Sequence, residues 1–369
     1  KDIGFNMVNI SNKTRKIENL KHEKILNCKN LTESEDRRVM FTKVCTLSIL
    51  LIQVLLLSWS GHSVYTYLVL KSSGIDFDFL VEIFPKDFQE NRLYNNSGNL
   101  IRYLSEDIAG NKNLNLIEKA LLGKYEFINS PPIDNKLPAW QIISLYSAFP
   151  DIGIDYLRNV SWIQDVFVGD SQGLRHGKIK IGPVEIFEAD VSFLYFIKKS
   201  RELLKSGNLY WGLRFFGYAL HYLQDLMQPY HVRPGTVSEL FVYPFDEGMR
   251  KKLRNLHTAY DRMMIYLILN DREILLKTIN HAKPLYFRSD EELITELFMY
   301  SYSKFFKIHE LQKIIFSNFI EKRVPSLEDF AEKSKTKEFE ELKKETYEIV
   351  SIMSSVIKGL LLSLQLPYH

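Results

Sequence analysis

The strongest constraint on how this chain can fold is a series of long segments in which apolar residues recur at helical spacing. Residues 189–206 place Val191, Leu194 and Ile197 on one face and charged residues on the other, which is typical of an amphipathic helix. The same kind of pattern continues through most of the rest of the chain, in residues 209–227, 247–282, 290–320 and 337–364. The sequence therefore predicts an all-α fold, a single domain of many helices.

Weaker signals describe the earlier part of the chain. A helix is expected from residue 62 to Gly74, and another over 138–149, because Pro138 suits the first turn of a helix. Residues 85–135 are rich in Asn, Gly, Ser and Pro, so we expect a loop-rich insert there. The run GKIKIGPVEIF, residues 177–187, is the one segment that predicts a small hairpin.

The segment 40–58 has the layout of a secretory signal peptide. Lys43 supplies a short basic head, residues 44–57 form an uncharged apolar run, and the small residue Ser58 follows. An uncleaved membrane anchor or a buried helix stays open as an alternative. The main prediction is a secreted or extracytoplasmic protein in three parts: an upstream extension over 1–39, a signal peptide over 40–58 and the functional domain over 59–369.

Charge and cysteine usage exclude several classes of protein. Residues 59–369 carry 38 basic and 39 acidic side chains, a net charge of −1, so a broad basic surface for duplex nucleic acid is not expected. The only two cysteines, Cys28 and Cys45, precede this domain. A disulfide framework and cysteine-based zinc sites are therefore excluded within it.

The most informative short segment is HYLQDLMQPYHV, residues 221–232. His221 and Asp225 are four residues apart, so both project from the same face of a helix. Pro229 ends that helix, and we expect His231 to lie on an extended segment that folds back past the helix end. A His-x3-Asp pair alone is common by chance. The same pair followed by a histidine six residues after the aspartate is rarely a coincidence.

A second pair with the same spacing, His257 and Asp261, lies on the next predicted helix. Imidazole nitrogens and carboxylate oxygens are the ligands that zinc and related divalent ions prefer. Each histidine taken alone is better explained as a core or helix-cap residue. His281 and His309 lie outside the motifs, and we predict surface or cap positions for both. The combination predicts a metal site.

These residues resemble the motifs of the zinc-dependent phospholipase C family and of the related fungal single-strand-specific zinc nucleases. The central motif matches without a gap at His221, Asp225 and His231, and the final pair matches at His257 and Asp261. Looser matches to the remaining positions of the family pattern are Trp59, His62, Asp151 and His176. The resemblance implies an all-α fold that holds three zinc ions in a cleft.

The resemblance also implies how the ligands divide among the ions. One zinc takes Asp151, His176, His221 and Asp225. A second takes His62 and the α-amino group of Trp59, with Asp225 as the bridge, and that amino group exists only if the chain is cut after Ser58. The third takes His231, His257 and Asp261, while Asp151 also acts as the catalytic residue that orients or deprotonates the attacking water.

The implied reaction is hydrolysis of a phosphodiester by a metal-bound hydroxide. We predict a phospholipase C-like enzyme that cleaves phospholipid head groups and contacts a membrane surface, with no protein partner evident. A nuclease that acts on single-stranded nucleic acid is the alternative within the family, since aromatic residues near the motifs suit base stacking as well as lipid contact. An alternative of another class is a membrane-tethered helical binding protein whose zinc site is structural.

Overall fold

The computed structural model describes residues 61–83, 125–130, 132–152, 176–181, 184–186, 188–243, 245–364 and 366. The chain divides into two compact units, Lys1–Leu50 and Leu51–His369, and every described residue belongs to the second. The predicted extension, the signal peptide, Trp59 and most of the loop-rich insert lie outside the described residues.

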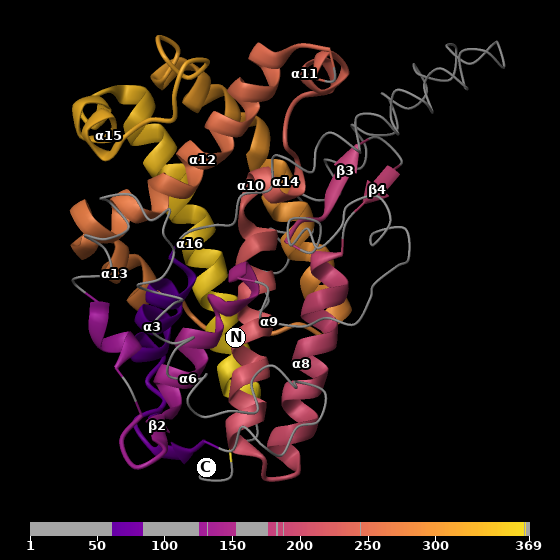
Figure 1. Ribbon diagram of the computed structural model, residues 1–369, viewed down its shortest axis with the longest axis vertical. Helices are drawn as coiled ribbons and strands as arrows, with labels where there is room; N and C mark the ends of the chain where they lie inside the picture. The colour runs from indigo at the N-terminus through magenta and orange to yellow at the C-terminus, as the bar shows by residue number, and fades with distance from the viewer. Residues whose placement is uncertain are drawn as a thin grey trace, which may run out of the picture. The chain divides into compact units, whose positions relative to one another are not determined.

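The described part of the chain is all-α, which confirms the predicted fold class (Figure 1). The longer helices are α3 (His62–Ser72), α6 (Ala139–Tyr146), α8 (Ala189–Lys205), α9 (Leu209–Met227), α12 (Glu247–Asn270), α13 (Arg272–His281), α14 (Asp290–Ile315) and α16 (Lys337–Ser363). Short helical elements connect them: η4 (Glu126–Asn129), η5 (Phe149–Ile152), α10 (Pro229–Val232), α11 (Val237–Val242) and α15 (Leu327–Lys333).

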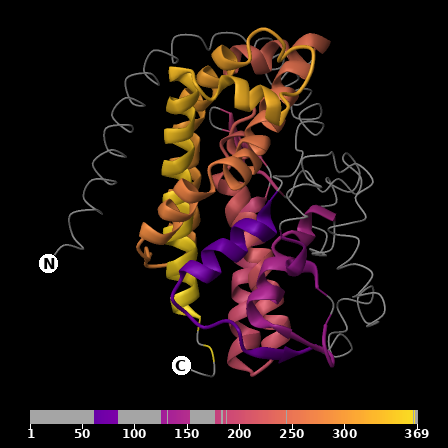
Figure 2. The ribbon, with the colours of Figure 1, turned by 90° about the vertical axis from the view of Figure 1, so that its left-hand side faces the viewer.

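Helix α9 lies at the centre of the helices. Its sequence, LYWGLRFFGYALHYLQDLM, is largely apolar on all sides, and every residue from Tyr210 to Met227 is buried. A helix with this composition is stable only when other elements surround it. It contacts α3, α6, α8, α10, α14 and α16. Figures 1 and 2 show α8 packed along its length and α3 crossing close to it and to α16.

Close packing between α6 and α9 depends on a glycine. A Cβ atom on Gly217 would lie 2.8 Å from the carbonyl oxygen of Ile143 and 2.9 Å from the Cβ of Tyr146. Both distances are shorter than real contacts of this kind, so only glycine allows α6 to come this near. The approach brings the end of α6, and with it Ser147, against the middle of α9.

Most predicted helices have the expected positions, with one clear exception. The segment predicted as one helix over 247–282 is two helices, since α12 ends at Asn270 and α13 begins at Arg272. Asp271 between them leaves the helical conformation, and its carboxylate lies 2.7 Å from the Nζ of Lys343 on α16. Asn and Asp are weak helix formers, so this tertiary ion pair coincides with the weakest point of the predicted helix.

The described residues contain two small antiparallel ladders where the sequence predicted one. The expected hairpin is present as β3 (Ile179–Ile181) paired with β4 (Val184–Ile186). The second ladder pairs β1 (Leu80–Glu82) with β2 (Lys136–Pro138), and it closes the two ends of the loop-rich segment. Strands this short and this far apart in sequence leave no usable pattern.

Helix α16 is long and apolar enough to cross a membrane by length and composition, but 61% of its most apolar window is buried inside the protein. Its buried residues pack against α3, α9, α13 and α14. Lys358 on this helix is also buried, and its ammonium group donates to the carbonyl oxygens of Ile279 and Ala282 at the end of α13. These contacts are those of a packed core helix.

Candidate metal centre

The buried face of α9 carries an unusual set of polar side chains. His221, Gln224 and Asp225 are each at most 1% exposed, and their spacing of three and four residues places them on one face of the helix. Polar groups at such depth destabilise a fold unless they are paired. The structure therefore has to supply partners for all three.

The carboxylate of Asp225 lies among four imidazole rings. Its Oδ2 is 3.0 Å from Nε2 of His221 and 2.9 Å from Nδ1 of His176. Its Oδ1 is 3.1 Å from Nδ1 of His231 and 3.5 Å from Nε2 of His62. We call His62, His176, His221 and Asp225 the Asp225 cluster. It joins α9 to the first turn of α3 and to the segment before β3.

Two of these histidines are oriented by carbonyl groups behind them. Nδ1 of His221 lies 2.8 Å from the backbone carbonyl oxygen of Ser147, and Nδ1 of His62 lies 2.9 Å from the side-chain oxygen of Gln224. A neutral ring that donates through Nδ1 has its lone pair on Nε2. In both rings, Nε2 is the atom that faces Asp225. Metal-binding histidines are held in this same way.

The electrostatics of the Asp225 cluster favour a cation. Burial lowers the pKa of His221, and the attraction of Asp225 does not fully offset it, so the neutral ring is favoured. Burial also raises the pKa of Asp225, but the charges and hydrogen bonds of the surrounding imidazoles outweigh this and hold that pKa well below its usual value. The lone pair on Nε2 of His221 therefore lies 3.0 Å from the Asp225 carboxylate and 2.7 Å from Nδ1 of His176, an arrangement of nitrogen and oxygen donors that suits a metal ion.

A second group, which we call the Asp261 cluster, consists of His231, His257 and Asp261. One ligand atom from each residue lies within 4.8 Å of the other two, and all three side chains are buried. Nδ1 of His231 donates to the carbonyl oxygen of His176 at 3.0 Å. Its Nε2 is buried and has no hydrogen-bond partner among the described residues. That nitrogen is oriented as a ligand would be.

His231 reaches this position differently from the prediction. The chain is extended only at Gln228, and Pro229 then begins the short helix α10, on which His231 lies. The predicted extended segment at His231 is therefore wrong. Proline is well suited to the first turn of a helix, and Gln228 caps that turn by accepting from the backbone N–H of Tyr230. Lys178 in turn donates its backbone N–H to the carbonyl oxygen of His231 at 3.0 Å.

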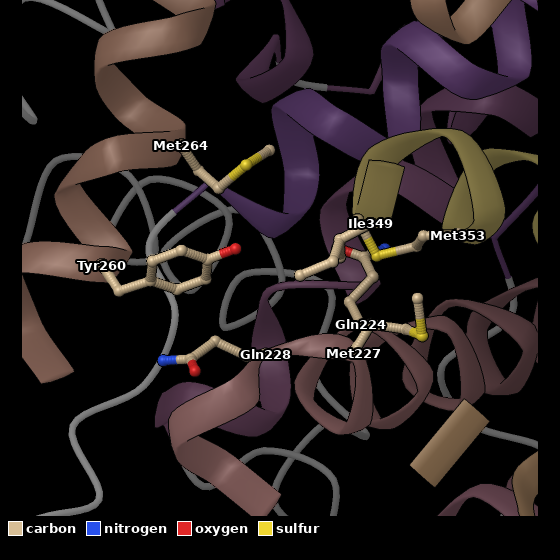
Figure 3. Close-up of a pocket in the computed structure, with 7 residues that line it drawn as sticks. All are labelled: Gln224, Met227, Gln228, Tyr260, Met264, Ile349 and Met353. Carbon is tan, nitrogen blue, oxygen red and sulfur yellow. The ribbon is translucent and has the colours of Figure 1, made fainter. Parts of the chain in front are cut away.

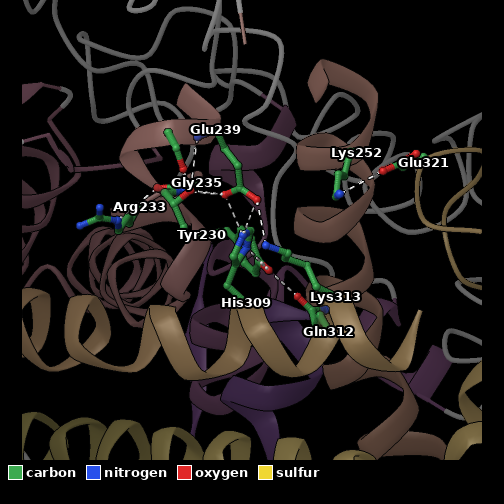
Figure 4. Close-up of polar contacts among 11 residues, drawn as sticks. Tyr230, Arg233, Gly235, Glu239, Lys252, His309, Gln312, Lys313 and Glu321 are labelled. Carbon is green, nitrogen blue, oxygen red and sulfur yellow. Dashed lines mark hydrogen bonds and ion pairs between the residues drawn. The ribbon is translucent and has the colours of Figure 1, made fainter. Parts of the chain in front are cut away.

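Behind the Asp261 cluster, a chain of polar contacts leads to the surface (Figure 4). The ring of Tyr230 stacks on His257, with the ring centres 5.9 Å apart. Its hydroxyl donates to Gln312 at 2.6 Å and lies 3.1 Å from Nδ1 of His309. Nε2 of His309 lies 2.9 Å from Glu239 on α11. His309 is thus buried and paired, so its predicted surface or cap role is wrong, whereas exposed His281 does end α13.

The described residues thus contain two buried groups that could hold metal ions. The nitrogen and oxygen donors, the oriented lone pairs and the carbonyl groups behind them fit zinc. Of the nine predicted ligands, seven lie in these two clusters. Trp59 lies outside the described residues, and so does the side chain of Asp151, whose backbone lies in η5.

The two groups can be compared with the implied ligand sets. His62 lies in one group with His221 and Asp225, and the resemblance implies that Asp225 bridges the ion of His221 and the ion of His62 and Trp59. The grouping of His231, His257 and Asp261 is the implied one. Sequence reasoning missed the residues that orient the ligands: Gln224, Gln228 and the carbonyl oxygen of Ser147. Only the glutamines carried a signal, as polar residues on an otherwise apolar helix.

Comparison with known proteins gives little further information. No protein-family model matches the sequence, and no curated protein matches it. Among solved structures, this chain is similar to the alpha toxin from Clostridium absonum, with 13% sequence identity and a TM-score of 0.28. The match covers 74% of this chain and 65% of that chain, less than two thirds of its length.

Proposed function

We propose that this protein is a zinc-dependent phosphodiester hydrolase that resembles phospholipase C and cleaves phospholipid head groups. One observation supports the proposal above all others: a fully buried carboxylate, Asp225, faces four imidazoles, and the Asp261 cluster lies next to it. A structural role alone does not require so many buried imidazole groups around one carboxylate. Adjacent metal sites of this composition are typical of hydrolases that act on phosphate esters.

In this proposal the Asp225 cluster and the Asp261 cluster each hold zinc, and a third ion is expected with Trp59. Bound zinc lowers the pKa of a coordinated water toward 7, which supplies a nucleophile at neutral pH. Asp151 is proposed to orient that water or take its proton. The packed residues of α9 keep bulk water away from the back of the site, and Ser147 and Gln224 hold His221 and His62 in their ligand tautomers.

The choice of phospholipid over nucleic acid is supported by charge and by the surface near the Asp261 cluster. The near-neutral charge of residues 59–369 disfavours a long polyanion. Four exposed apolar side chains gather on α11 and the turn after it: Val237, Phe241, Val242 and Phe245. Such a patch suits contact with lipid better than contact with a phosphate backbone. We further propose that the protein acts outside the cytoplasm.

The test combines metal analysis with two substrates. Purified protein should contain zinc and release the phosphorylated head group from phosphatidylcholine in mixed micelles. It should act far more slowly on a single-stranded oligonucleotide. A chelator should abolish hydrolysis, and added zinc should restore it.

Each alternative predicts a different result. Preferred hydrolysis of the oligonucleotide would favour the nuclease. Stoichiometric zinc without hydrolysis of either substrate would favour a binding protein with a structural metal site. Protein that binds no zinc would overturn the proposal.

A further inference from the structure

We infer that Gln224 and Gln228 are positioning residues that serve the two clusters with opposite hydrogen-bond polarity. Gln224 accepts a hydrogen bond from a ligand of the Asp225 cluster, and Gln228 donates a hydrogen bond to a ligand of the Asp261 cluster. This inference rests on the proposed binding of zinc at both clusters. It goes further by assigning each glutamine to one ion and by predicting opposite results for the same substitution four residues apart.

The polarity of Gln224 is fixed by its two partners. Its Nε2 donates to the hydroxyl oxygen of Thr66 at 2.8 Å, so its oxygen must face the other way. That oxygen lies 2.9 Å from Nδ1 of His62, and only the N–H of the ring can complete this contact. Gln224 therefore holds the proton of His62 on Nδ1 and leaves Nε2 to face Asp225.

The polarity of Gln228 is the reverse. Its oxygen accepts from the backbone N–H of Tyr230 and caps α10, so its Nε2 faces the ligands. That nitrogen donates to Oδ1 of Asp261 at 2.9 Å. The other oxygen, Oδ2, is the one on the side of His257, 3.6 Å from its Nε2. Gln228 thus occupies one carboxylate oxygen and directs the other toward the metal position.

Both glutamines line one small cavity of about 10 Å³ between α9, α12 and α16 (Figure 3). The other lining residues are mostly apolar: Met227, Tyr260, Met264, Ile349 and Met353. A space of this size holds about one water molecule, so it cannot hydrate a charge. A carboxylate introduced at either position must therefore be stabilised or destabilised by the ligand it faces.

The decisive substitution is glutamine to glutamate at each position. Gln224→Glu keeps the acceptor for His62 and adds a negative charge near a cation, so the Asp225 cluster should keep its zinc affinity or gain some. Gln228→Glu keeps the cap on Tyr230 but replaces the donor to Asp261 with a second carboxylate. The Asp261 cluster should then lose zinc affinity by about 10- to 100-fold, the usual effect of removing a group that orients a metal ligand.

Each cluster is measured alone, in a background that lacks the other. Gln224→Glu and Gln224→Leu are compared in a His257→Ala background, and Gln228→Glu and Gln228→Leu in an Asp225→Asn background. Zinc affinity is determined by competition with a chromophoric chelator, and circular dichroism checks that each variant is folded. Leucine removes donor and acceptor alike, so it should weaken zinc binding at both positions.

The outcomes separate the inference from the function it rests on. Retention of zinc in Gln224→Glu with loss in Gln228→Glu supports opposite polarity. Equal behaviour of the two glutamate variants, while both backgrounds still bind zinc, would overturn the inference and leave the zinc hydrolase intact. Failure of both backgrounds and of the unmodified protein to bind zinc would overturn the two together.

Discussion

The Asp225 cluster and the Asp261 cluster use the same ligand types but are supported in different ways. Behind the Asp225 cluster lie a backbone carbonyl at Ser147 and a glutamine, both fixed by the packing of α6 and α3 on α9. Behind the Asp261 cluster lie side chains, first Gln228 and Tyr230, then His309 and Glu239 toward the surface. One cluster depends on how helices pack, the other on a chain of polar contacts.

This difference indicates how each cluster should respond to change. A backbone carbonyl moves only when its helix moves, so the Asp225 cluster should respond to changes in helix packing and hardly at all to surface chemistry. A chain of ionisable side chains responds to charge and pH even when the backbone stays in place. Substitutions can therefore disturb one cluster and spare the other.

The largest effect is expected from Asp225→Asn. The amide keeps the size of the side chain but removes the negative charge that four imidazoles face. We expect loss of zinc from the Asp225 cluster, loss of hydrolysis, and a decrease of about 3 kcal/mol or more in the unfolding free energy of the metal-free protein. Burial lowers the pKa of His231, but Asp225 outweighs this and raises it, so the substitution breaks a buried charge pair on one side. The Asp261 cluster should keep its zinc, because His231 still has the carbonyl of His176.

Zinc content per chain and urea unfolding measure these effects. Asp190→Asn is the matched control, since Asp190 pairs with Lys178 near the start of α8 and faces neither cluster. It should leave zinc content unchanged. If Asp225→Asn empties both clusters to the same extent, the proposed independence of the two clusters is wrong.

An intermediate effect is expected from Gly217→Ala, which acts on helix packing alone. The added methyl group would meet the backbone of α6 at 2.8 Å, so α6 must move away from α9. Overpacking of this kind costs about 1 to 3 kcal/mol of unfolding free energy. The movement should also displace the carbonyl of Ser147 from His221 and weaken zinc binding at the Asp225 cluster only.

Chelator competition and thermal unfolding test this prediction. Gly248→Ala is the control, because a Cβ there would meet only the side-chain Oδ1 of Asp246 at 3.1 Å, in the exposed first turn of α12 and away from both clusters. It should preserve both clusters. A Gly217→Ala variant that loses stability while its zinc affinity stays normal would show that α6 does not orient His221.

The sequence predicts the all-α fold and the ligand spacing because both depend on local periodicity. His221 and Asp225 lie on one face of α9, as residues four apart on a helix must. The helix bounds are also close to those expected for α8, α9 and α16. Each of these features belongs to a single segment, so the sequence of that segment is enough to predict it.

The features that could not be predicted depend on partners far away in the sequence. The break at Asp271 involves Lys343, and the tautomer of His221 is set by a backbone carbonyl that leaves no mark on the sequence. The burial of His309 follows from Tyr230 and Glu239, which belong to other helices. A single sequence shows which groups are polar but not which groups face each other.

The smallest effect is expected from Glu239→Gln, at the outer end of the polar chain. Burial raises the pKa of Glu239, but the hydrogen bond and charge of His309 and the donors of Thr236 outweigh it and hold that pKa well below its usual value of 4.5. A lowered pKa stabilises the fold above the unfolded value and loses this contribution as the pH falls through the folded value. The ionised carboxylate should therefore contribute about 1 kcal/mol near pH 7.

Urea unfolding of the unmodified protein and of Glu239→Gln across a pH series tests this direction of the pH dependence. The difference in unfolding free energy should stay constant from pH 7 to roughly pH 5 and shrink at lower pH, as Glu239 gains its proton. Lys313, which lies 3.3 Å from the same carboxylate, and Tyr230, which contacts His309, remain unchanged in the variant. Zinc affinity of the Asp261 cluster should change by less than about tenfold, since Glu239 reaches it only through His309 and Tyr230. A difference in unfolding free energy that grows as the pH falls would show that the pKa of Glu239 is not lowered in the folded protein. A change in zinc affinity at the Asp225 cluster instead would show that the polar chain does not lead to the Asp261 cluster.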